Sequence, residues 1–398
     1  MDILHPTPHT DIHTKTDLEE AGKIEDMMND HLGHFNKMFR LGSHHPNGSR
    51  RIAEASKSSN VLPPPLYGLR KTHKQNQNGP QGPAMRPVCG AKEAPNSRFS
   101  RFCSKVVTDI ADMVGDSREC RSSEEMRAAF EAFNSNVDVN VRKKTIIFSK
   151  DAKALFPSMQ KEVCKMAIIW IIDKEEVNID NMDWTQVTRY IAVNMSPEDI
   201  EKEGLTNVIP GRVKVTRRKL TMNSLSVNTA DNDWQQSAPP NETQKRKLLG
   251  LVMAMGVEIK MSNHSFMLGD DVFLQTNGGP IGLEFTGSMS RVVMMWWDHL
   301  YLQKCLSVGL NMVIYERFVD DSNQAVEVPD DDTAENVLLK LENIANSILP
   351  GINMEVDLPS NHSDAKLPIL DMKCFMEDGY LMYEHYEKLM ATKLIISS

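Results

Sequence analysis

Long apolar runs are missing from this 398-residue chain, which has no stretch near the roughly 18 consecutive apolar residues that a membrane-spanning helix needs. The first twenty residues are rich in His, Thr and Asp and lack the apolar segment of a secretory signal. Cysteine is scarce: the six residues include no closely spaced pair, which argues against a disulfide framework or a zinc knuckle. These absences predict an intracellular protein, nuclear or cytoplasmic and not secreted, with reduced thiols and no membrane partner.

The composition is that of a globular protein, with 40% hydrophobic and 25% charged residues. A net charge of -9 argues against a nucleic-acid partner, but the charge is unevenly distributed. The segment from Arg40 to Lys105 contains about twelve Lys or Arg residues and only two acids, Glu54 and Glu93. Such a basic segment suits a partner that carries phosphates, and it is equally compatible with an ordinary solvated surface.

Helical and strand-like patterns alternate along the chain and predict an α+β fold. Ser122, with Glu125 three residues on, is expected to form a capping box that opens one of the helices. The helices are expected at 98–113, 122–133, 160–170 and 245–259, and in a long apolar segment through Trp296 and Trp297. The strands are expected at 145–149, on both sides of 319–320, and in hairpins that turn at Gly269-Asp270-Asp271 and at Asp378-Gly379.

Three parts are expected along the chain. Residues 1–60 form an N-terminal extension that is partly disordered, residues 61–366 form the main body, and residues 367–398 begin with a closing hairpin. Within the body, residues 173–243 are polar and irregular and are interpreted as an insertion.

Two adjacent carboxylates, Asp320 and Asp321, lie between apolar strands. Neighbouring carboxylates repel each other unless protons or a cation intervene, so a divalent cation would stabilise the pair, although a solvated turn explains it too. Asp151, at the end of the strand expected at 145–149, supplies a third acid from a separate element. Because phosphoryl transfer by two metal ions about 3.5 to 4 Å apart needs such acids, the pattern predicts two Mg²⁺ ions, replaceable by Mn²⁺.

A glycine loop, NGGPIG, lies between these acids in the sequence. Gly278 and Gly279 would allow the backbone to approach a base pair or a ribose, and Gln275 could contact an incoming nucleotide. A tight turn before a helix explains the same glycines equally well.

The order of strand acid, glycine loop with helix, and hairpin with two acids resembles the palm of a reverse transcriptase. The chain is most similar to the Penelope-like retroelement type, over about residues 63–396. The resemblance rests on LYGLRKTHK with RPVCGA, KDAKALFPSM, QTNGGPIG, ERFVDD and LPILDMKCFMEDGYLMY. It implies a right-hand polymerase with fingers and palm in residues 61–366, a truncated or missing thumb, and no GIY-YIG endonuclease.

The resemblance also implies an activity and its partners. The chain would be an RNA-directed DNA polymerase of a retrotransposon that binds an RNA template, a DNA or RNA primer and deoxynucleoside triphosphates. Asp151, Asp320 and Asp321 would be the catalytic, metal-binding acids. Phe156 would lie beneath the sugar and exclude a 2′-hydroxyl, unless it is a core aromatic.

Further site residues follow from the same resemblance. Lys71, Lys74 and Arg86 would hold the triphosphate, where template contacts or solvated charges are the alternatives. Leu370, Asp371 and Met372 would open a primer-gripping hairpin, which could equally be an edge hairpin of the palm.

The alternative functions are an inactive remnant, a viral-type RNA polymerase and a telomerase. The shortened C-terminal end and a glycine loop that reads GGPIGLEFTG fit an inactive or domesticated remnant that acts as an RNA-binding protein. A viral-type RNA polymerase is disfavoured by Phe156, and a telomerase would need an RNA-binding domain for which residues 1–60 are too short.

Overall fold

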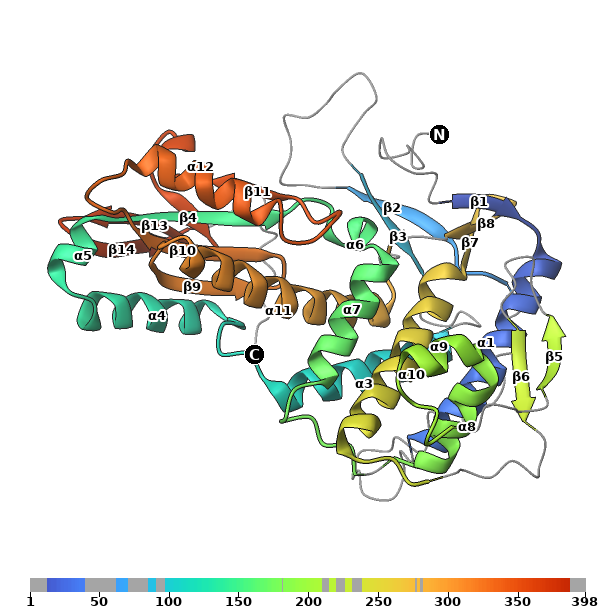
Figure 1. Ribbon diagram of the computed structural model, residues 1–398. Coiled ribbons are helices and arrows are strands. Elements are labelled where there is room, and N and C mark those ends of the chain that lie inside the picture. The colour runs from blue at the N-terminus through green and yellow to red at the C-terminus, as the bar shows by residue number, and fades with distance from the viewer. Residues whose placement is uncertain are drawn as a thin grey trace, which may run out of the picture. The chain divides into compact units, whose positions relative to one another are not determined.

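The computed structural model describes residues 13–39, 62–70, 85–90, 97–180, 182–209, 215–219, 226–230, 238–275, 278–279 and 282–386. The chain forms two compact units, both discontinuous in sequence (Figure 1). Unit 1 comprises Met1–Leu69, Pro87–Gly115 and Met159–Val293, and unit 2 comprises Arg70–Arg86, Asp116–Ser158 and Met294–Ser398. The division falls within the long helix α11 (Glu284–Ser307).

Unit 1 is mainly helical. Its helices, beside the start of α11, are α1 (Leu18–Met38), α3 (Ser97–Val114), α7 (Lys161–Ile172), α8 (Trp184–Asn194), α9 (Pro197–Lys202) and α10 (Glu242–Ser262). Local signals begin them: the Asp17 side chain accepts a hydrogen bond from Glu20 N at α1, and Asn241 and Gln244 form a reciprocal capping box at α10. Phe35 of α1 packs edge-on against Phe99 and Phe102 of α3, which joins these helices in one core.

Short sheets lie mostly within unit 1. One sheet has the order β1 (His13–Thr16), β8 (Asp271–Gln275), β7 (His264–Leu268). The other two are the pairs β2 (Leu66–Arg70) with β3 (Met85–Cys89), and β5 (Val215–Lys219) with β6 (Ser226–Ala230).

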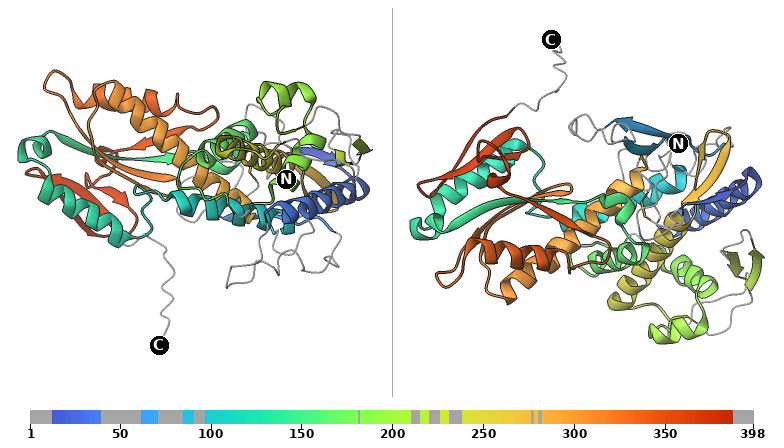
Figure 2. Two further views of the ribbon diagram at one scale, coloured as in Figure 1. Left: turned by 60° about the horizontal axis from the view of Figure 1, so that its bottom comes forward. Right: turned by 90° about the horizontal axis from the view of Figure 1, so that it is seen from above.

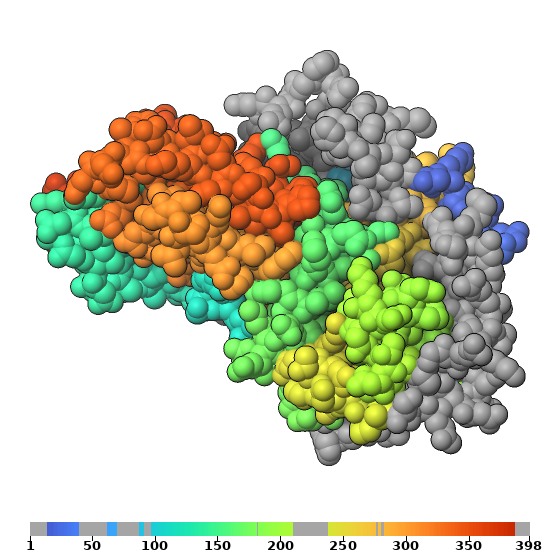
Figure 3. Space-filling model, in the orientation of Figure 1, coloured from blue at the N-terminus to red at the C-terminus, as the bar shows by residue number. Residues whose placement is uncertain are grey.

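Unit 2 is built on a four-stranded antiparallel sheet. Its order is β11 (Met354–Asp357), β4 (Thr145–Ala152), β10 (Asp321–Glu327), β9 (Met312–Phe318). The end of α11 and helix α12 (Ala334–Ala345) lie on one face of the sheet, and Figure 3 shows this helical covering from outside. The opposite face carries α4 (Ser123–Asn136) and a second sheet of β12 (Leu367–Ile369), β13 (Met372–Glu377) and β14 (Tyr380–His385), as Figure 2 shows. Two short helices, α5 (Val139–Lys143) and α6 (Leu155–Ser158), flank β4 in the chain.

The strand period assigns the residues of the four-stranded sheet to its two faces, because successive side chains alternate. Ile147, Ile314 and Ala325 point to the face of α4, where they form one buried cluster with Phe130 and Phe133. This cluster occupies only part of that face. Towards the β9–β10 turn the same face carries polar and acidic side chains instead of a core.

The α+β class predicted from the sequence is confirmed, and so are most of the expected elements. Ser122 caps α4 as expected, with its hydroxyl accepting from Glu125 N at 3.2 Å, but Glu125 bonds back to Arg121 N at 2.6 Å. The interpretation of residues 173–243 as irregular is wrong for α8 and α9. The physical reason is that Val187, Tyr190 and Ile191 form a buried face of α8, although the sequence around them is mostly polar.

None of the helices in the described ranges is both long and apolar enough to cross a bilayer. All six cysteines are buried and unbridged, and burial raises the pKa of Cys89, Cys103 and Cys374 to about 12. The division into 1–60, 61–366 and 367–398 remains a prediction.

Candidate functional site

Strand register brings Asp151 and Asp321 together. Asp321 is the first residue of β10 and pairs directly with Asp151 of β4, although 169 positions separate them in the chain. Paired residues on neighbouring antiparallel strands project on the same face, with Cβ atoms roughly 5 Å apart. On the other side of Asp151 the edge strand β11 places Glu355, so three carboxylates follow one another across three strands.

Asp320 joins them from the turn between β9 and β10. Phe318 and Asp321 pair across this hairpin, so Val319 and Asp320 are its two turn residues. Asp151, Asp320 and Asp321 each offer a carboxylate oxygen, and these oxygens lie within 4.8 Å of one another. Asp151 and Asp321 are exposed and Asp320 is half-buried, so the cluster is open to a ligand.

The donor set fits a hard divalent cation. Mg²⁺ prefers carboxylate oxygens and binds through one or two carboxylates together with the phosphates of a substrate. Three carboxylates at this spacing repel one another, and a bound cation relieves that repulsion. The residues present therefore suit Mg²⁺ or Mn²⁺ on chemical grounds.

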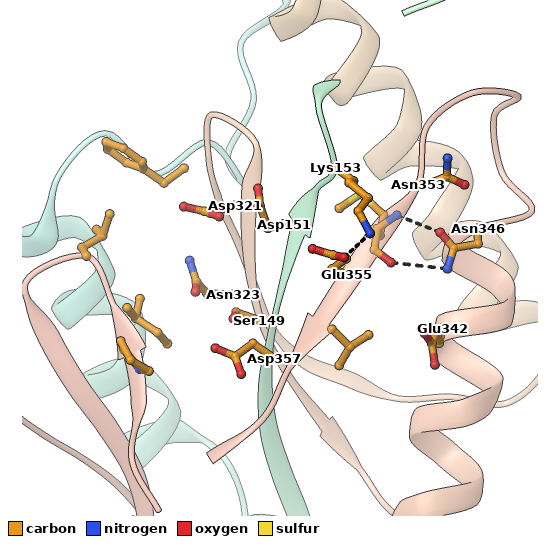
Figure 4. Close-up of a pocket in the computed structure, with 16 residues that line it drawn as sticks. Ser149, Asp151, Lys153, Asp321, Asn323, Glu342, Asn346, Asn353, Glu355 and Asp357 are labelled. Atoms are coloured by element: carbon orange, nitrogen blue, oxygen red, sulfur yellow. Dashed lines mark hydrogen bonds and ion pairs between the residues drawn. The ribbon is translucent and has the colours of Figure 1, made fainter. Parts of the chain in front are cut away.

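A cavity of about 840 Å³ in unit 2 is lined by two of these acids, Asp151 and Asp321 (Figure 4). Asp151 and Asp321 lie at one end, and Ser149 and Asn323 form the next pair across the same two strands. Glu355 lines the cavity as well and forms an ion pair with Lys153. The remaining wall includes Phe318 of β9, Pro368 and Ile369 of β12, and Leu370 in the turn after β12. The cavity thus combines an acidic end with an apolar side wall.

The residues expected to grip a primer occupy different environments. Leu370 and Asp371 form the turn between β12 and β13. Leu370 has a positive φ of 54°, and its side chain lines the cavity. A hydrogen bond from Ser123 lowers the pKa of Asp371, and Arg127 lies 3.6 Å from its carboxylate. Met372 is 1% exposed and packs in the core of unit 2. Only Leu370 of the three therefore faces the cavity.

Phe156 belongs to the short helix α6, which follows β4 in unit 2. Its side chain is partly exposed, whereas its neighbour Leu155 is buried. Because the Phe156 ring is only partly buried, packing in the core does not by itself explain an aromatic residue five positions after Asp151.

The glycine-loop residues lie in unit 1. Gln275 is buried and donates from Nε2 to Gly278 O at 3.2 Å. A Cβ at Gly279 would come within 2.5 Å of the Thr286 side chain, so packing against α11 excludes any larger residue there. Internal packing thus accounts for Gln275 and Gly279 by itself, and a role in nucleotide binding stays a prediction.

The predicted triphosphate ligands are only partly covered by the structure. Lys71 and Lys74 lie outside the described residues. Arg86 belongs to strand β3, but its side chain is outside the described part. The second acid pair, Asp270-Asp271, forms an exposed turn in unit 1, where Asp271 is 2.7 Å from Lys15. The hairpin turn predicted at Gly269-Asp270-Asp271 is confirmed, and it joins β7 to β8.

Sequence reasoning missed the buried charges beneath the acids. Arg317 of β9 and Asp298 of α11 form an ion pair of 2.6 Å, with side chains 1% and 0% exposed. Burial raises the pKa of Asp298 even though Arg317 opposes the shift. Lys150, next to Asp151, is also buried, and burial lowers its pKa to about 7. A charged residue inside an apolar run, as in VIYERFV and MMWWDHLY, was the available signal.

No protein-family model and no curated protein matches the sequence. Among solved structures, telomerase from Candida albicans in complex with a fragment of telomeric RNA is similar, with 10% identity and a TM-score of 0.45 over 83% of this chain and 48% of that chain. Apo telomerase from Candida tropicalis has 9% identity and a TM-score of 0.44, covering 94% and 56% of the two chains.

A viral enzyme is similar to the same degree. The BmCPV RNA-dependent RNA polymerase in its quiescent state has 11% identity and a TM-score of 0.43, covering 91% of this chain and 25% of that one. The chain thus spans between a quarter and just over half of the length of these proteins.

Proposed function

We propose that this chain is an RNA-directed DNA polymerase, a reverse transcriptase of the Penelope-like retroelement type. One observation supports the proposal most: the carboxylates of Asp151, Asp320 and Asp321 converge within 4.8 Å on a β-hairpin and its neighbouring strand. Unit 2 would be the palm, and the substrates would be an RNA template, a DNA or RNA primer and deoxynucleoside triphosphates.

The three acids would hold the metal. Asp151 and Asp320 would be the main ligands of two Mg²⁺ ions, and Asp321 would contribute from the start of β10. When bound, the ions would lower the pKa of the primer 3′-hydroxyl and neutralise charge on the departing pyrophosphate. The chain's own contribution is to hold three oxygens in place before substrate arrives, on two paired strands and one tight turn.

Other residues would bind and select the substrates. Lys71, Lys74 and Arg86 would hold the triphosphate, and Gln275, Gly278 and Gly279 would lie near the incoming nucleotide. In unit 2, Phe156 would exclude a 2′-hydroxyl. Leu370 would contact the primer end from the apolar wall of the cavity, while Asp371 and Met372 would support its turn.

Primer extension tests the proposal. The full chain, given a homopolymer RNA template, a DNA primer, the matching deoxynucleotide and Mg²⁺, should extend the primer. Asp151→Asn and Asp320→Asn should each lower the rate by about a thousandfold or more, because they remove metal ligands. Asp270→Asn is the matched control, because it makes the same change at an exposed aspartate of a hairpin turn in unit 1.

The outcomes separate the rival functions. Extension that persists undiminished in Asp320→Asn would refute the assignment of the acids. Tight binding of the template and primer without extension would favour an RNA-binding remnant. Incorporation of ribonucleotides in preference to deoxynucleotides would favour an RNA polymerase.

A further inference from the structure

Arg317 is a buried guanidinium three residues before Asp320. Its Nε donates to Asp298 Oδ2 at 2.6 Å, and its Nη2 donates to Asp116 Oδ2 at 3.2 Å. The Arg317, Asp298 and Asp116 side chains are 1%, 0% and 2% exposed. Burying charges in this way is costly unless each is paired, so the arrangement calls for an explanation beyond stability.

The third contact of Arg317 reaches the turn that carries Asp320. Its Nη1 donates to the backbone oxygen of Val319 at 3.0 Å. This oxygen belongs to the peptide group that joins Val319 to Asp320. Because a peptide group is planar, the hydrogen bond restrains the orientation of the whole group. On the other side, Ala152 N donates to Asp320 O at 3.4 Å. Both peptides that flank Asp320 are therefore held.

Val319 makes this restraint necessary. Its φ is +59°, in the left-handed region that a β-branched residue rarely adopts. Such a conformation persists only where surrounding contacts impose it, and it is common at functional sites. Without the Arg317 bond, the Val319 to Asp320 peptide would be free to relax towards negative φ, which would turn the Asp320 carboxylate away from its neighbours.

The two carboxylates that hold Arg317 are themselves anchored. Tyr315 donates its hydroxyl to Asp298 Oδ1 at 2.6 Å, and Arg118 Nε donates to Asp116 Oδ1 at 3.1 Å. The segment after Asp116 also pairs with the backbone of Arg317, through Arg317 N to Arg118 O at 2.8 Å and Cys120 N to Arg317 O at 2.9 Å. These contacts hold the Arg317 guanidinium in one position, so that its hydrogen bond to Val319 O can restrain the turn.

We propose that Arg317 is a positioning residue that holds the strained Val319–Asp320 turn so that the three carboxylates bind a divalent cation. The proposal rests on the proposed function only in assigning a cation to Asp151, Asp320 and Asp321. Lysine cannot replace Arg317, because one ammonium group cannot match the three directions of the guanidinium fork towards Asp298, Asp116 and Val319.

The test measures Mn²⁺ binding to the full chain by isothermal titration calorimetry, which does not depend on activity. Arg317→Lys should raise the Mn²⁺ dissociation constant by about 10- to 100-fold, the usual cost of losing a residue that orients a metal ligand. Asp320→Asn should abolish the binding. Tyr315→Phe is the matched control: it removes a bond to Asp298 from the same buried network, leaves the Val319 contact in place, and should change the dissociation constant by less than about twofold.

A rescue variant tests the strain directly. Glycine adopts positive φ at little cost, so Val319→Gly added to Arg317→Lys should recover part of the lost Mn²⁺ affinity. Should Arg317→Lys not fold, Arg317→Met combined with Asp298→Asn and Asp116→Asn leaves no buried charge unpaired, because Arg118, the other partner of Asp116, is partly exposed. This neutral variant should show the same loss of Mn²⁺ affinity.

Each result decides between clear alternatives. A folded Arg317→Lys protein that binds Mn²⁺ within about twofold of the parent would overturn the proposal, and so would an equal loss in Tyr315→Phe. If the parent binds Mn²⁺ through Asp320 but does not extend primers, the proposed function fails while the positioning role stands. If the parent binds no Mn²⁺, both fail.

Discussion

Lys150 Nζ donates a hydrogen bond of 2.5 Å to the hydroxyl of Tyr301, on the face of β4 opposite to Asp151. The Tyr301 hydroxyl in turn donates to Gln324 Oε1 at 3.0 Å, which connects β4, α11 and β10 through one buried chain of contacts. The strands that carry two of the three acids are therefore joined from behind by polar contacts as well as by their backbone ladder.

Tyr301→Phe should destabilise unit 2 more than its single lost hydroxyl suggests. It removes the close acceptor of a buried ammonium group, and we expect the free energy of unfolding to fall by roughly 1 to 3 kcal/mol. Adding Lys150→Met should restore most of the loss, because both partners are then apolar. Urea unfolding of the parent, both single variants and the double variant measures this coupling; strictly additive losses would contradict it.

Phe156→Ala should relax sugar selection. If the ring lies beneath the sugar, the variant should incorporate ribonucleotides roughly 10- to 100-fold better relative to deoxynucleotides. Single-nucleotide extension with each nucleotide type gives the ratio. Phe130→Leu, a core substitution in the same unit, is the control and should leave the ratio unchanged. An unchanged ratio in Phe156→Ala would mean that the ring only packs.

Met372 and Leu370 should differ in how they affect primer use. Met372→Ala opens a hole in the core of unit 2 and should lower the free energy of unfolding by roughly 2 to 5 kcal/mol. Leu370→Ala should instead raise the KM for primer, because Leu370 lines the cavity. Thermal unfolding and primer titration measure the two effects. A raised primer KM in a folded Met372→Ala protein, with none in Leu370→Ala, would reverse the assignment.

Acid should destabilise unit 1 through His31. Burial is the larger cause and the neighbouring His34 the smaller cause that together lower the pKa of His31 from its ordinary value of 6.5 to about 4. Because the unfolded chain takes up this proton and the folded chain does not, stability present above pH 6.5 is lost as the pH falls towards 4. The loss is roughly 3 kcal/mol.

The variant His31→Leu with Tyr190→Phe tests the origin of this acid sensitivity. It removes both ends of the 2.8 Å hydrogen bond between the His31 ring and the Tyr190 hydroxyl, so no buried polar group is left without its partner. Urea unfolding at pH 7 and pH 4.5 should show a smaller acid-induced loss in this variant than in the parent. An equal loss in both proteins would assign the acid sensitivity to other groups.

The sequence by itself determined the local features of this protein. The hydrophobic period predicted most helices and strands, and the capping residue Ser122 marked the start of α4. Adjacent acids between apolar strands marked Asp320 and Asp321. These features can be predicted from the sequence because each depends on residues only a few positions apart. The helix α8 was missed, since its buried face of Val187, Tyr190 and Ile191 lies within a segment that is polar on average.

Only the tertiary structure decided which distant residues meet. The pairing of Asp321 with Asp151, the burial of Met372 and the bond from Arg317 to Val319 O each depend on how separate segments pack. A shift of one residue in the β4–β10 register would turn Asp151 to the opposite face, and no local pattern around Asp151 records that register. The acids could be identified from the sequence, but their convergence comes from strand pairing.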